Sequence, residues 1–389
     1  MRSTPGIIIF VVVMLLLDFY IFQAFKTISS DSRYRGPLFI IFWSISLICI
    51  VAFLFFALSG PDYLNKKVRS YLFAIVIGLF MAKLVAVVFF IIDDLRRLIQ
   101  LISSKLFFRN TEVETMEAEG ISRSVFLSWL GMIAGGSLFG TLLYGFSNKY
   151  NYKIIRKKIS FDNLPSGFKG MKIVHISDIH SGSLLNVQAV EKGVNKIMDQ
   201  KPDLILFTGD LVNDKATEMK PLMNVFNKLS APMGVYSVLG NHYYGDYVQW
   251  PIDGVSKAQN LENLKYLQKE LGWKLLMNEH VVFERGDDKI ALLGIENWSA
   301  KINFPKHGRL DLAHKGTEHI PFKILMSHDP SHWDAEIRPL YPDIDLTLAG
   351  HTHGMQFGVE LPGIKWSPVQ YVYKEWADLY EETKQKIYV

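Results

Sequence analysis

Four long apolar segments near the N-terminus constrain the fold of this chain more than any other feature. Each is long enough to cross a bilayer, because a hydrocarbon core of about 30 Å requires about 20 helical residues. Backbone polar groups find no water in lipid, so such segments must satisfy them internally as helices. The sequence therefore predicts a transmembrane region over residues 1–148, with spans at residues 7–25, 37–58, 71–92 and 125–146.

The charges inside these spans bear on what the region does. Asp18 interrupts the first span, and no small-residue cleavage site follows it, which argues against a cleaved signal peptide. Lys83 lies near the middle of the third span, where an ionisable group is costly unless it is paired or hydrated. We expect Asp18 and Lys83 to form a structural ion pair; a transport role for the two charges is the alternative.

The fourth span carries glycines at a spacing that lets helices approach closely. They form the patterns Gly131-x-x-x-Gly135 and Gly136-x-x-x-Gly140. We interpret this spacing as packing within the four-helix region. Basic residues are almost evenly divided between the two sides of the membrane, so they do not determine the orientation.

Charge and cysteine content exclude several classes of function. The net charge of +4 is too small to indicate a nucleic-acid partner. The single cysteine, Cys49, lies in an apolar segment and excludes both an internal disulfide and a cysteine-based zinc site. No feature of the sequence predicts the oligomeric state.

The chain changes character after residue 148. Residues 149–160 are basic and alternating, and they predict a linker that becomes the first strand of a soluble domain over residues 161–389. Within that domain, short apolar strands alternate with helices. Asn186 is a candidate N-cap for a helix whose apolar face includes Val190 and Val194. This alternation is typical of an α/β fold.

Aspartate, asparagine and histidine follow five of the apolar strands. The motifs are Asp178-Ile-His180, Gly209-Asp210, Gly240-Asn241-His242, Ser327-His328 and Gly350-His351-Thr-His353. Loops at strand ends converge in open α/β sheets, so these side chains should meet at one place. One such residue alone is usually a cap or a surface group. Five motifs in order, with oxygen and nitrogen ligands and a glycine beside several of them, indicate a site for two divalent cations that share a carboxylate.

These five motifs resemble those of the calcineurin-like metallophosphoesterases, and the likeness extends from about residue 153 to the C-terminus. The segments Ser327-His-Asp-Pro330 and Gly350-His-Thr-His-Gly354 most resemble those of the membrane-associated bacterial branch of this family. That branch includes enzymes acting on phosphorylated lipid precursors. The resemblance implies a four-layer α-β-β-α sandwich after the transmembrane region. It also implies hydrolysis of a phosphomonoester or phosphodiester by a hydroxide that bridges the two metals.

The resemblance also assigns roles to individual residues. His242 would steady the phosphoryl oxygens or protonate the leaving oxygen. One metal would be held by Asp178, His180, Asp210 and His353, and the other by Asp210, Asn241, His328 and His351. These ligands suit Mn, Fe, Zn or Ni alike. The other histidines are expected to be surface or packing residues, His332 being closest in sequence to His328.

Three features depart from the family pattern. Tyr243 follows His242 where many members have an acidic residue, and Met355 stands where members often have glycine. The chain also stops at Lys386-Ile-Tyr-Val389, an apparent strand start, which predicts a truncated domain.

The sequence therefore predicts a multi-pass membrane enzyme, a metal-dependent phosphoric ester hydrolase. The alternative is a membrane sensor or scaffold that binds phosphate without turnover. A lipid-linked substrate is expected because so few residues separate the last span from the domain. Tyr243, Tyr244, Tyr247 and Trp250 would either form an apolar lip for its chains or pack in the core. The segment Ser122-Arg-Ser-Val-Phe-Leu127 is similar to a degraded twin-arginine export signal and favours an extracytoplasmic domain.

Overall fold

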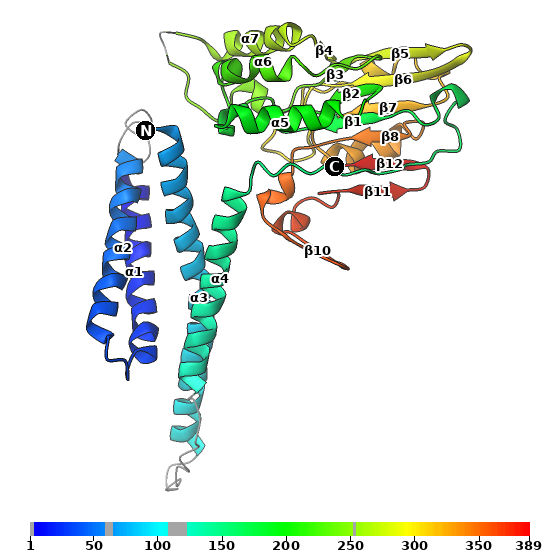
Figure 1. Cartoon of the computed structure of the whole chain (residues 1–389). Helices are drawn as coiled ribbons and strands as arrows, with labels where there is room; N and C mark the ends of the chain where they lie inside the picture. The colour runs from blue at the N-terminus through cyan, green and yellow to red at the C-terminus, as the bar shows by residue number, and fades with distance from the viewer. Residues whose placement is uncertain (1–3, 59–64, 108–122, 252–253) are drawn as a thin grey trace. The chain divides into compact units, whose positions relative to one another are not determined.

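The computed structural model describes residues 4–58, 65–107, 123–251 and 254–389. The chain divides into two compact units, Met1–Asn151 and Tyr152–Val389 (Figure 1). Among the described residues, the first unit is helical and the strands belong to the second.

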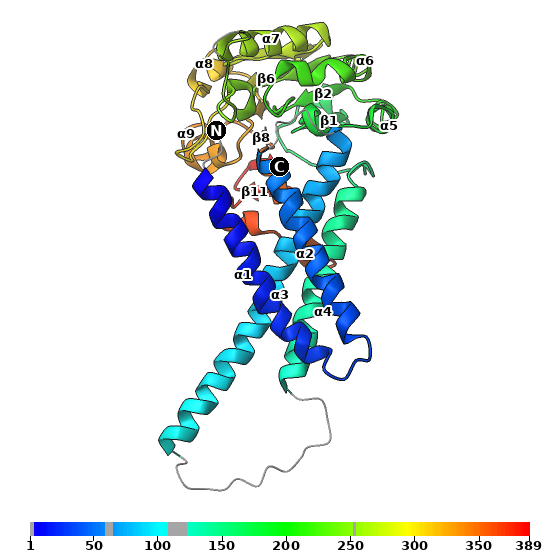
Figure 2. The same cartoon turned by 90° about the vertical axis from the view of Figure 1, so that its left-hand side faces the viewer.

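The first unit consists of four helices that are long and apolar enough to cross a membrane, as the sequence predicts. They are α1 (Thr4–Ile28), α2 (Arg35–Leu58), α3 (Lys66–Phe107) and α4 (Arg123–Ser147). Both views show α3 and α4 lying side by side, and α1 also packs against α3 (Figure 2).

Helix α3 is longer than its predicted span. It has 42 residues, which corresponds to roughly 63 Å at 1.5 Å per residue and exceeds the hydrocarbon thickness of a bilayer. Past Ile92 the helix carries ion pairs of Asp93 with Arg96 and Arg97 one turn further on, which favour the helical conformation. Hydropathy therefore identified the apolar part of this helix and missed its polar continuation.

The two charges inside the spans pair with each other, which confirms the expected ion pair. Lys83 Nζ lies 2.5 Å from Asp18 Oδ1, and the Asp18 side chain is fully buried. Such a pair removes most of the cost of placing either charge in the membrane.

Glycines of α4 allow its close approach to α3. A Cβ at Gly131 would lie 2.7 Å from the Phe90 ring, and one at Gly135 would lie 2.6 Å from the Ala82 carbonyl oxygen. A Cβ at Gly136 or Gly140 would meet nothing within 4 Å. The first of the two glycine patterns therefore accounts for packing within the bundle.

We expect Gly135→Val to destabilise the helical unit and Gly136→Val to leave its stability nearly unchanged. At position 135 the added methyl groups must push α4 away from the Ala82 backbone, and overpacking of this kind costs about 1–3 kcal/mol. Thermal unfolding of the two variants in the same detergent measures the difference. Equal transition temperatures would show that the close approach of α3 and α4 contributes no stability.

The second unit contains two larger sheets. The first sheet is parallel throughout, in the order β1-β2-β3-β4. Its strands are β1 (Ile173–Ile176), β2 (Leu204–Phe207), β3 (Val235–Ser237) and β4 (Lys274–Leu275). The second sheet is mixed, in the order β11-β12-β8-β7-β6-β5. Its strands are β5 (Glu279–Arg285), β6 (Asp288–Gly294), β7 (Lys323–Met326), β8 (Leu346–Leu348), β11 (Leu379–Glu382) and β12 (Gln385–Tyr388). A hairpin of β9 (Val359–Leu361) and β10 (Ile364–Trp366) lies between β8 and β11 in the chain.

Alternation along the strands produces the layers of this unit. Ile290 and Leu292 of β6 face a core shared with the first sheet, whereas Ala291 and Leu293 face a core shared with helices. The α-helices in the described part of this unit are α5 (Val187–Met198), α6 (Met223–Phe226), α7 (Lys257–Glu270), α8 (Leu310–His314) and α9 (Arg338–Leu340). The α/β fold and its helix-covered pair of sheets agree with the prediction (Figure 1).

The structure confirms the predicted N-cap at Asn186 and contradicts the predicted strand over residues 151–160. Helix α5 begins after Asn186, whose side chain accepts a hydrogen bond from the Ala189 N–H, as an N-cap should. No strand forms over residues 151–160, however, so the predicted first strand is wrong. Residues 153–158 are exposed, and with no face to bury, alternation alone does not produce a strand. The apparent strand start at Lys386 is part of β12, which pairs with β8 and β11.

Candidate metal centre

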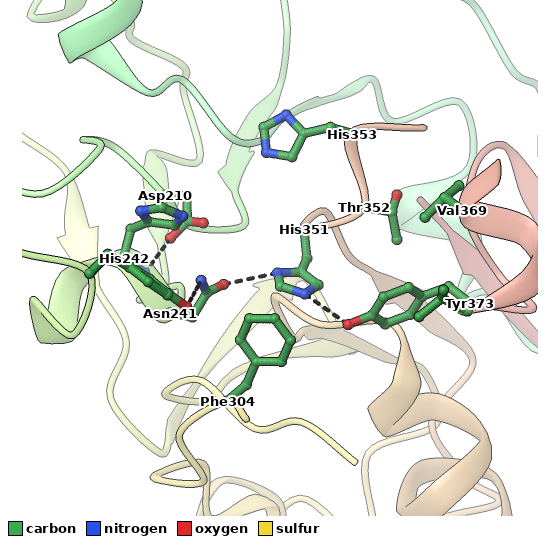
Figure 3. A pocket seen from close by; sticks show the side chains of 11 residues that line it. Asp210, Asn241, His242, Phe304, His351, Thr352, His353, Val369 and Tyr373 are labelled. Carbon is green, nitrogen blue, oxygen red and sulfur yellow. Dashed lines mark hydrogen bonds between the residues drawn. The ribbon is translucent and has the colours of Figure 1, made fainter. Parts of the chain in front are cut away.

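The candidate ligands all follow strands whose ends meet on one side of the unit. Asp178 and His180 follow β1, Asp210 follows β2, and Asn241 follows β3. The second sheet supplies three more candidate ligands, which are His328 after β7 and His351 and His353 after β8. The structure thus brings all seven candidate ligands together, and Figure 3 shows several of them around one cavity.

The backbone at this site is held in an unusual conformation. Five of the seven candidate ligands have left-handed backbones, with φ of 52° at Asp178, 44° at His180, 60° at Asp210, 69° at His351 and 50° at His353. Such angles are uncommon outside glycine and persist only where the surroundings impose them. Bonds between the loops do so here: the Asp178 N–H donates to the Gly209 carbonyl, and the His180 N–H to the Asp210 carbonyl, at 2.9 and 3.0 Å.

The glycines in the motifs have two different roles. Gly209, with φ of 106°, provides the sharp turn that the sequence predicts. Gly240 and Gly350 do not have left-handed backbones, so close packing is the reason for glycine at these positions. A Cβ at Gly240 would lie 2.2 Å from Asp210 Oδ1, and one at Gly350 would lie 2.2 Å from Asp178 Oδ2.

The donor atoms fall into overlapping groups. Asp178, His180 and His353 form one group, in which His353 Nε2 lies 3.1 Å from both Asp178 Oδ1 and His180 Nε2. Asp210, His328 and His351 form another group. Asp210 Oδ2 lies 3.1 Å from His328 Nε2 and 3.8 Å from His180 Nε2, so this carboxylate lies between the two groups.

Asn241 adds a neutral oxygen to the second group. Its Oδ1 is 2.9 Å from His351 Nδ1 and 3.1 Å from His328 Nε2. The Nδ2 of the same amide donates to the Tyr247 hydroxyl at 2.7 Å, which orients the oxygen toward the two histidines. A third possible group consists of His180, Asp210 and His242.

The electrostatics of the cluster suit cations. Burial opposes the ionised form of Asp178, but His353 and His328 outweigh burial and hold its pKa below the usual range. Burial likewise opposes ionisation of Asp210, and His328 lowers its pKa. Burial by itself would lower the pKa of His328, but the neighbouring Asp210 raises this pKa to about 10. Positive charge is therefore favoured beside the two carboxylates. A divalent cation would supply this charge, so the residues fit a metal.

Groups behind the candidate ligands orient their rings. His328 Nδ1 is hydrogen-bonded to the Thr208 carbonyl oxygen at 2.7 Å. His351 Nε2 is hydrogen-bonded to the Tyr373 hydroxyl at 2.9 Å, and that hydroxyl donates to Asp329 Oδ2 at 3.4 Å. Partners of this kind fix the tautomer of metal-binding histidines. Sequence reasoning missed Tyr373, which lies in no motif, and Asp329, although it directly follows His328.

His242 is held by the backbone. Its Nδ1 is hydrogen-bonded to the Asn213 carbonyl oxygen, and its N–H donates to Asp210 Oδ1 at 3.0 Å. Glu218 fixes the Asn213 loop, because its carboxylate accepts hydrogen bonds from the backbone N–H groups of residues 213–215. The Asn213 carbonyl thus orients the His242 ring. The next residue, Tyr243, is not acidic and so supplies no carboxylate for this purpose.

The aromatic residues after Asn241 do not form a common lip. Tyr243 is fully buried, and Tyr244 is also in the core, where its hydroxyl donates to Glu296 at 3.3 Å. Trp250 donates to the Gly245 carbonyl and does not line the cavity. Of the four aromatic residues, Tyr247 alone lines the cavity, so the core-packing alternative is correct for Tyr243 and Tyr244. His332 is also buried, where it is hydrogen-bonded to Ser327 Oγ at 2.9 Å, outside the ligand groups.

The cavity beside the ligands has a volume of about 320 Å³. It is lined by Asp210, Asn241, His242, Tyr247, Phe304, His351, Thr352, His353, Val369, Val372 and Tyr373. Four of the potential ligands, Asp210, Asn241, His351 and His353, therefore share one cavity with His242.

Comparisons with known proteins agree with this geometry. Residues 1–149 match the model of a probable calcineurin-like phosphoesterase transmembrane domain, and residues 171–355 match that of the calcineurin-like phosphoesterases. A zebrafish (Danio rerio) transmembrane protein with metallophosphoesterase domain is 28% identical over 65% of this chain, and the match spans 55% of that protein. The uncharacterized metallophosphoesterase YkuE of Bacillus subtilis is 28% identical over 69% of this chain and 89% of its own length.

A solved structure described as GAP50, the anchor in the inner membrane complex of Plasmodium, is 15% identical with a TM-score of 0.34. The match covers 56% of this chain and 70% of that one. The two family matches together account for the four apolar helices and for the unit that carries the ligand groups. The chain is a membrane protein and belongs to the calcineurin-like metallophosphoesterases.

Proposed function

We propose that this chain is a membrane-anchored, metal-dependent hydrolase of phosphomonoesters or phosphodiesters. The position of Asp210 carries the proposal, because its carboxylate lies between two groups of potential ligands, 3.1 Å from His328 Nε2 and 3.8 Å from His180 Nε2. Two divalent cations about 3.5–4 Å apart require such a shared anion.

Each cation would have its own set of protein ligands. Asp178, His180, Asp210 and His353 would hold one, and Asp210, Asn241, His328 and His351 the other. Bound there, two divalent cations supply positive charge that lowers the pKa of water and neutralises the phosphoryl oxygens. Nitrogen and oxygen donors of this kind suit Mn, Fe, Zn or Ni.

The residues of the chain itself position the substrate and move the proton. His242 lines the cavity, and its Nδ1 is engaged by the Asn213 carbonyl. Because a carbonyl oxygen only accepts, Nδ1 carries a proton. In the doubly protonated ring, the other nitrogen can protonate the leaving oxygen or donate a hydrogen bond to a phosphoryl oxygen. A sensor or scaffold that only binds phosphate does not require this arrangement.

The test is metal-dependent hydrolysis by the purified full-length chain. We expect the protein with Mn²⁺ to release p-nitrophenol from p-nitrophenyl phosphate or from bis(p-nitrophenyl) phosphate, and chelation by EDTA to abolish the release. Elemental analysis of the same sample shows whether metal is bound. Bound metal with no release from either ester would favour the sensor or scaffold.

We further propose that the substrate is amphiphilic and reached from the bilayer. Helix α4 ends at Ser147 and the second unit begins at Tyr152, so the tether is short. A short tether raises the encounter rate with a lipid phosphate without any new contact. The extracytoplasmic side remains a prediction based on residues 122–127, of which residue 122 lies outside the described part of the chain.

A further inference from the structure

One side of the cavity beside the candidate metal centre is apolar. We call the side chains of Tyr247, Phe304, Val369, Val372 and Tyr373 the apolar wall. They come from three separate loops, after β3, after β6 and after β10. Figure 3 shows Val369 and Tyr373 on the side of His351 away from Asp210, and Phe304 next to the His351 ring.

The polar atoms of this side are already engaged within the protein. The Tyr247 hydroxyl accepts from Asn241, and the Tyr373 hydroxyl is hydrogen-bonded to His351 and donates to Asp329. The hydroxyl of Thr352, which also lines the cavity, donates to the Trp376 carbonyl. None of the described lining residues is Lys or Arg. Because Tyr247 accepts in its bond with Asn241, its O–H remains a donor in the wall, and Lys301 Nζ lies 5.2 Å from the centroid of the Tyr373 ring. The side chains of Phe304, Val369 and Val372 offer only apolar surface.

Packing holds most of the wall in place. Val369 and Tyr373 are buried, and the Phe304 ring stands edge-on to the His351 ring with 4.7 Å between the centroids. Val372 is 52% exposed and forms the open part of the wall. A preformed apolar surface of this kind binds without a large ordering cost.

Two strongly exposed apolar residues are close in sequence to members of the wall. Ile302, two residues before Phe304, is 96% exposed, and Tyr371, next to Val372, is 77% exposed. They are the two most exposed large apolar side chains among the described residues of the second unit.

We propose that the apolar wall is the subsite for a hydrocarbon chain esterified to the phosphate that reacts at the metal centre. This inference rests on the proposed function and specifies its substrate class: a phosphate ester with an alkyl or acyl chain close to phosphorus. Binding of the chain buries methylene groups against Phe304, Val369 and Val372. Full burial strengthens binding by about fourfold per methylene.

The experiment measures kcat/KM for a series of p-nitrophenyl alkyl phosphodiesters with methyl, butyl and octyl chains. The full-length chain with Mn²⁺ is assayed in lipid nanodiscs. We expect kcat/KM to rise by at least about tenfold from methyl to butyl, and Val372→Ser to reduce that rise severalfold. The matched control is Val187→Ser, an exposed valine of α5 that does not line the cavity, which should keep the wild-type rise. Comparing the two variants cancels the partitioning of the probes into lipid.

Several results would overturn the inference. One is hydrolysis without chain-length dependence, and another is an equal rise in both serine variants. A third is a higher kcat/KM for the p-nitrophenyl ester of thymidine 5′-phosphate than for the octyl ester, which would indicate a nucleoside in the subsite. Calorimetric binding of methyl-, butyl- and octylphosphonate in the presence of Mn²⁺ tests the wall without turnover. Chain-dependent binding without hydrolysis would contradict only the proposed function.

Discussion

Asp210→Asn is expected to lose tightly bound metal at both sites and almost all activity. The Asp210 carboxylate lies between the two ligand groups and is almost fully buried, so its charge is the one shared by both proposed cations. Without it, two neighbouring cations repel each other with less compensation. Their contribution to transition-state stabilisation is several kcal/mol, which corresponds to a loss of about a thousandfold or more.

The substitution is conservative enough to separate charge from fold. Asp210 Oδ1 accepts a hydrogen bond from the His242 N–H at 3.0 Å, and the amide oxygen of asparagine can accept the same bond. Elemental analysis after dialysis measures the metal content, and thermal unfolding checks the fold. Asp311→Asn, at an exposed carboxylate paired with Arg309, is the matched control and should retain both metals. Two tightly bound metals in Asp210→Asn would contradict the shared-carboxylate assignment.

The convergence of the candidate ligands could be predicted from the sequence because the relevant signals are local. Asp178, Asp210 and His328 each follow a short apolar strand, and strand ends in an α/β fold lie at a common edge. The Asn186 cap and the apolar lengths of the four membrane helices are also local features. In these cases the residue type and its neighbours carry the information.

Features that depend on tertiary contacts could not be predicted in the same way. Residues 151–160 alternate like a strand, but residues 153–158 are exposed and pair with no strand. Tyr243 and Tyr244 are buried because their loop turns back toward the core, which no local pattern indicates. The group that orients His242 is the main-chain carbonyl of Asn213, and a backbone carbonyl has no sequence signal at all.

The same limit applies to the reasons for individual residues. Glycine beside Asn241 and beside His351 suggests a turn, whereas the structure requires space for the carboxylates of Asp210 and Asp178. Both readings predict glycine, so the sequence cannot distinguish them. The apolar wall also depends on tertiary structure, because residues 247, 304 and 369–373 become neighbours only in the folded unit.

His242→Ala is expected to keep both metals and to lose about two to four orders of magnitude in kcat. His242 lines the cavity, and its Nδ1 is hydrogen-bonded to the Asn213 carbonyl. We therefore propose that His242 acts on the reacting phosphate and does not hold a metal. Activity and metal content are measured on the same preparation. The matched control is His319→Ala, at an exposed histidine that does not line the cavity, and it should resemble the wild type.

Two substrates then separate the two possible roles of His242. A general acid matters most when the leaving oxygen is strongly basic, so the loss should be larger for an alkyl ester than for a p-nitrophenyl ester. A group that steadies the phosphoryl oxygens should lower kcat equally for both esters. His180, Asp210 and His242 could also form a ligand group of their own. Loss of one metal in His242→Ala would therefore assign His242 to the metal ligands, and unchanged kcat would remove it from the mechanism.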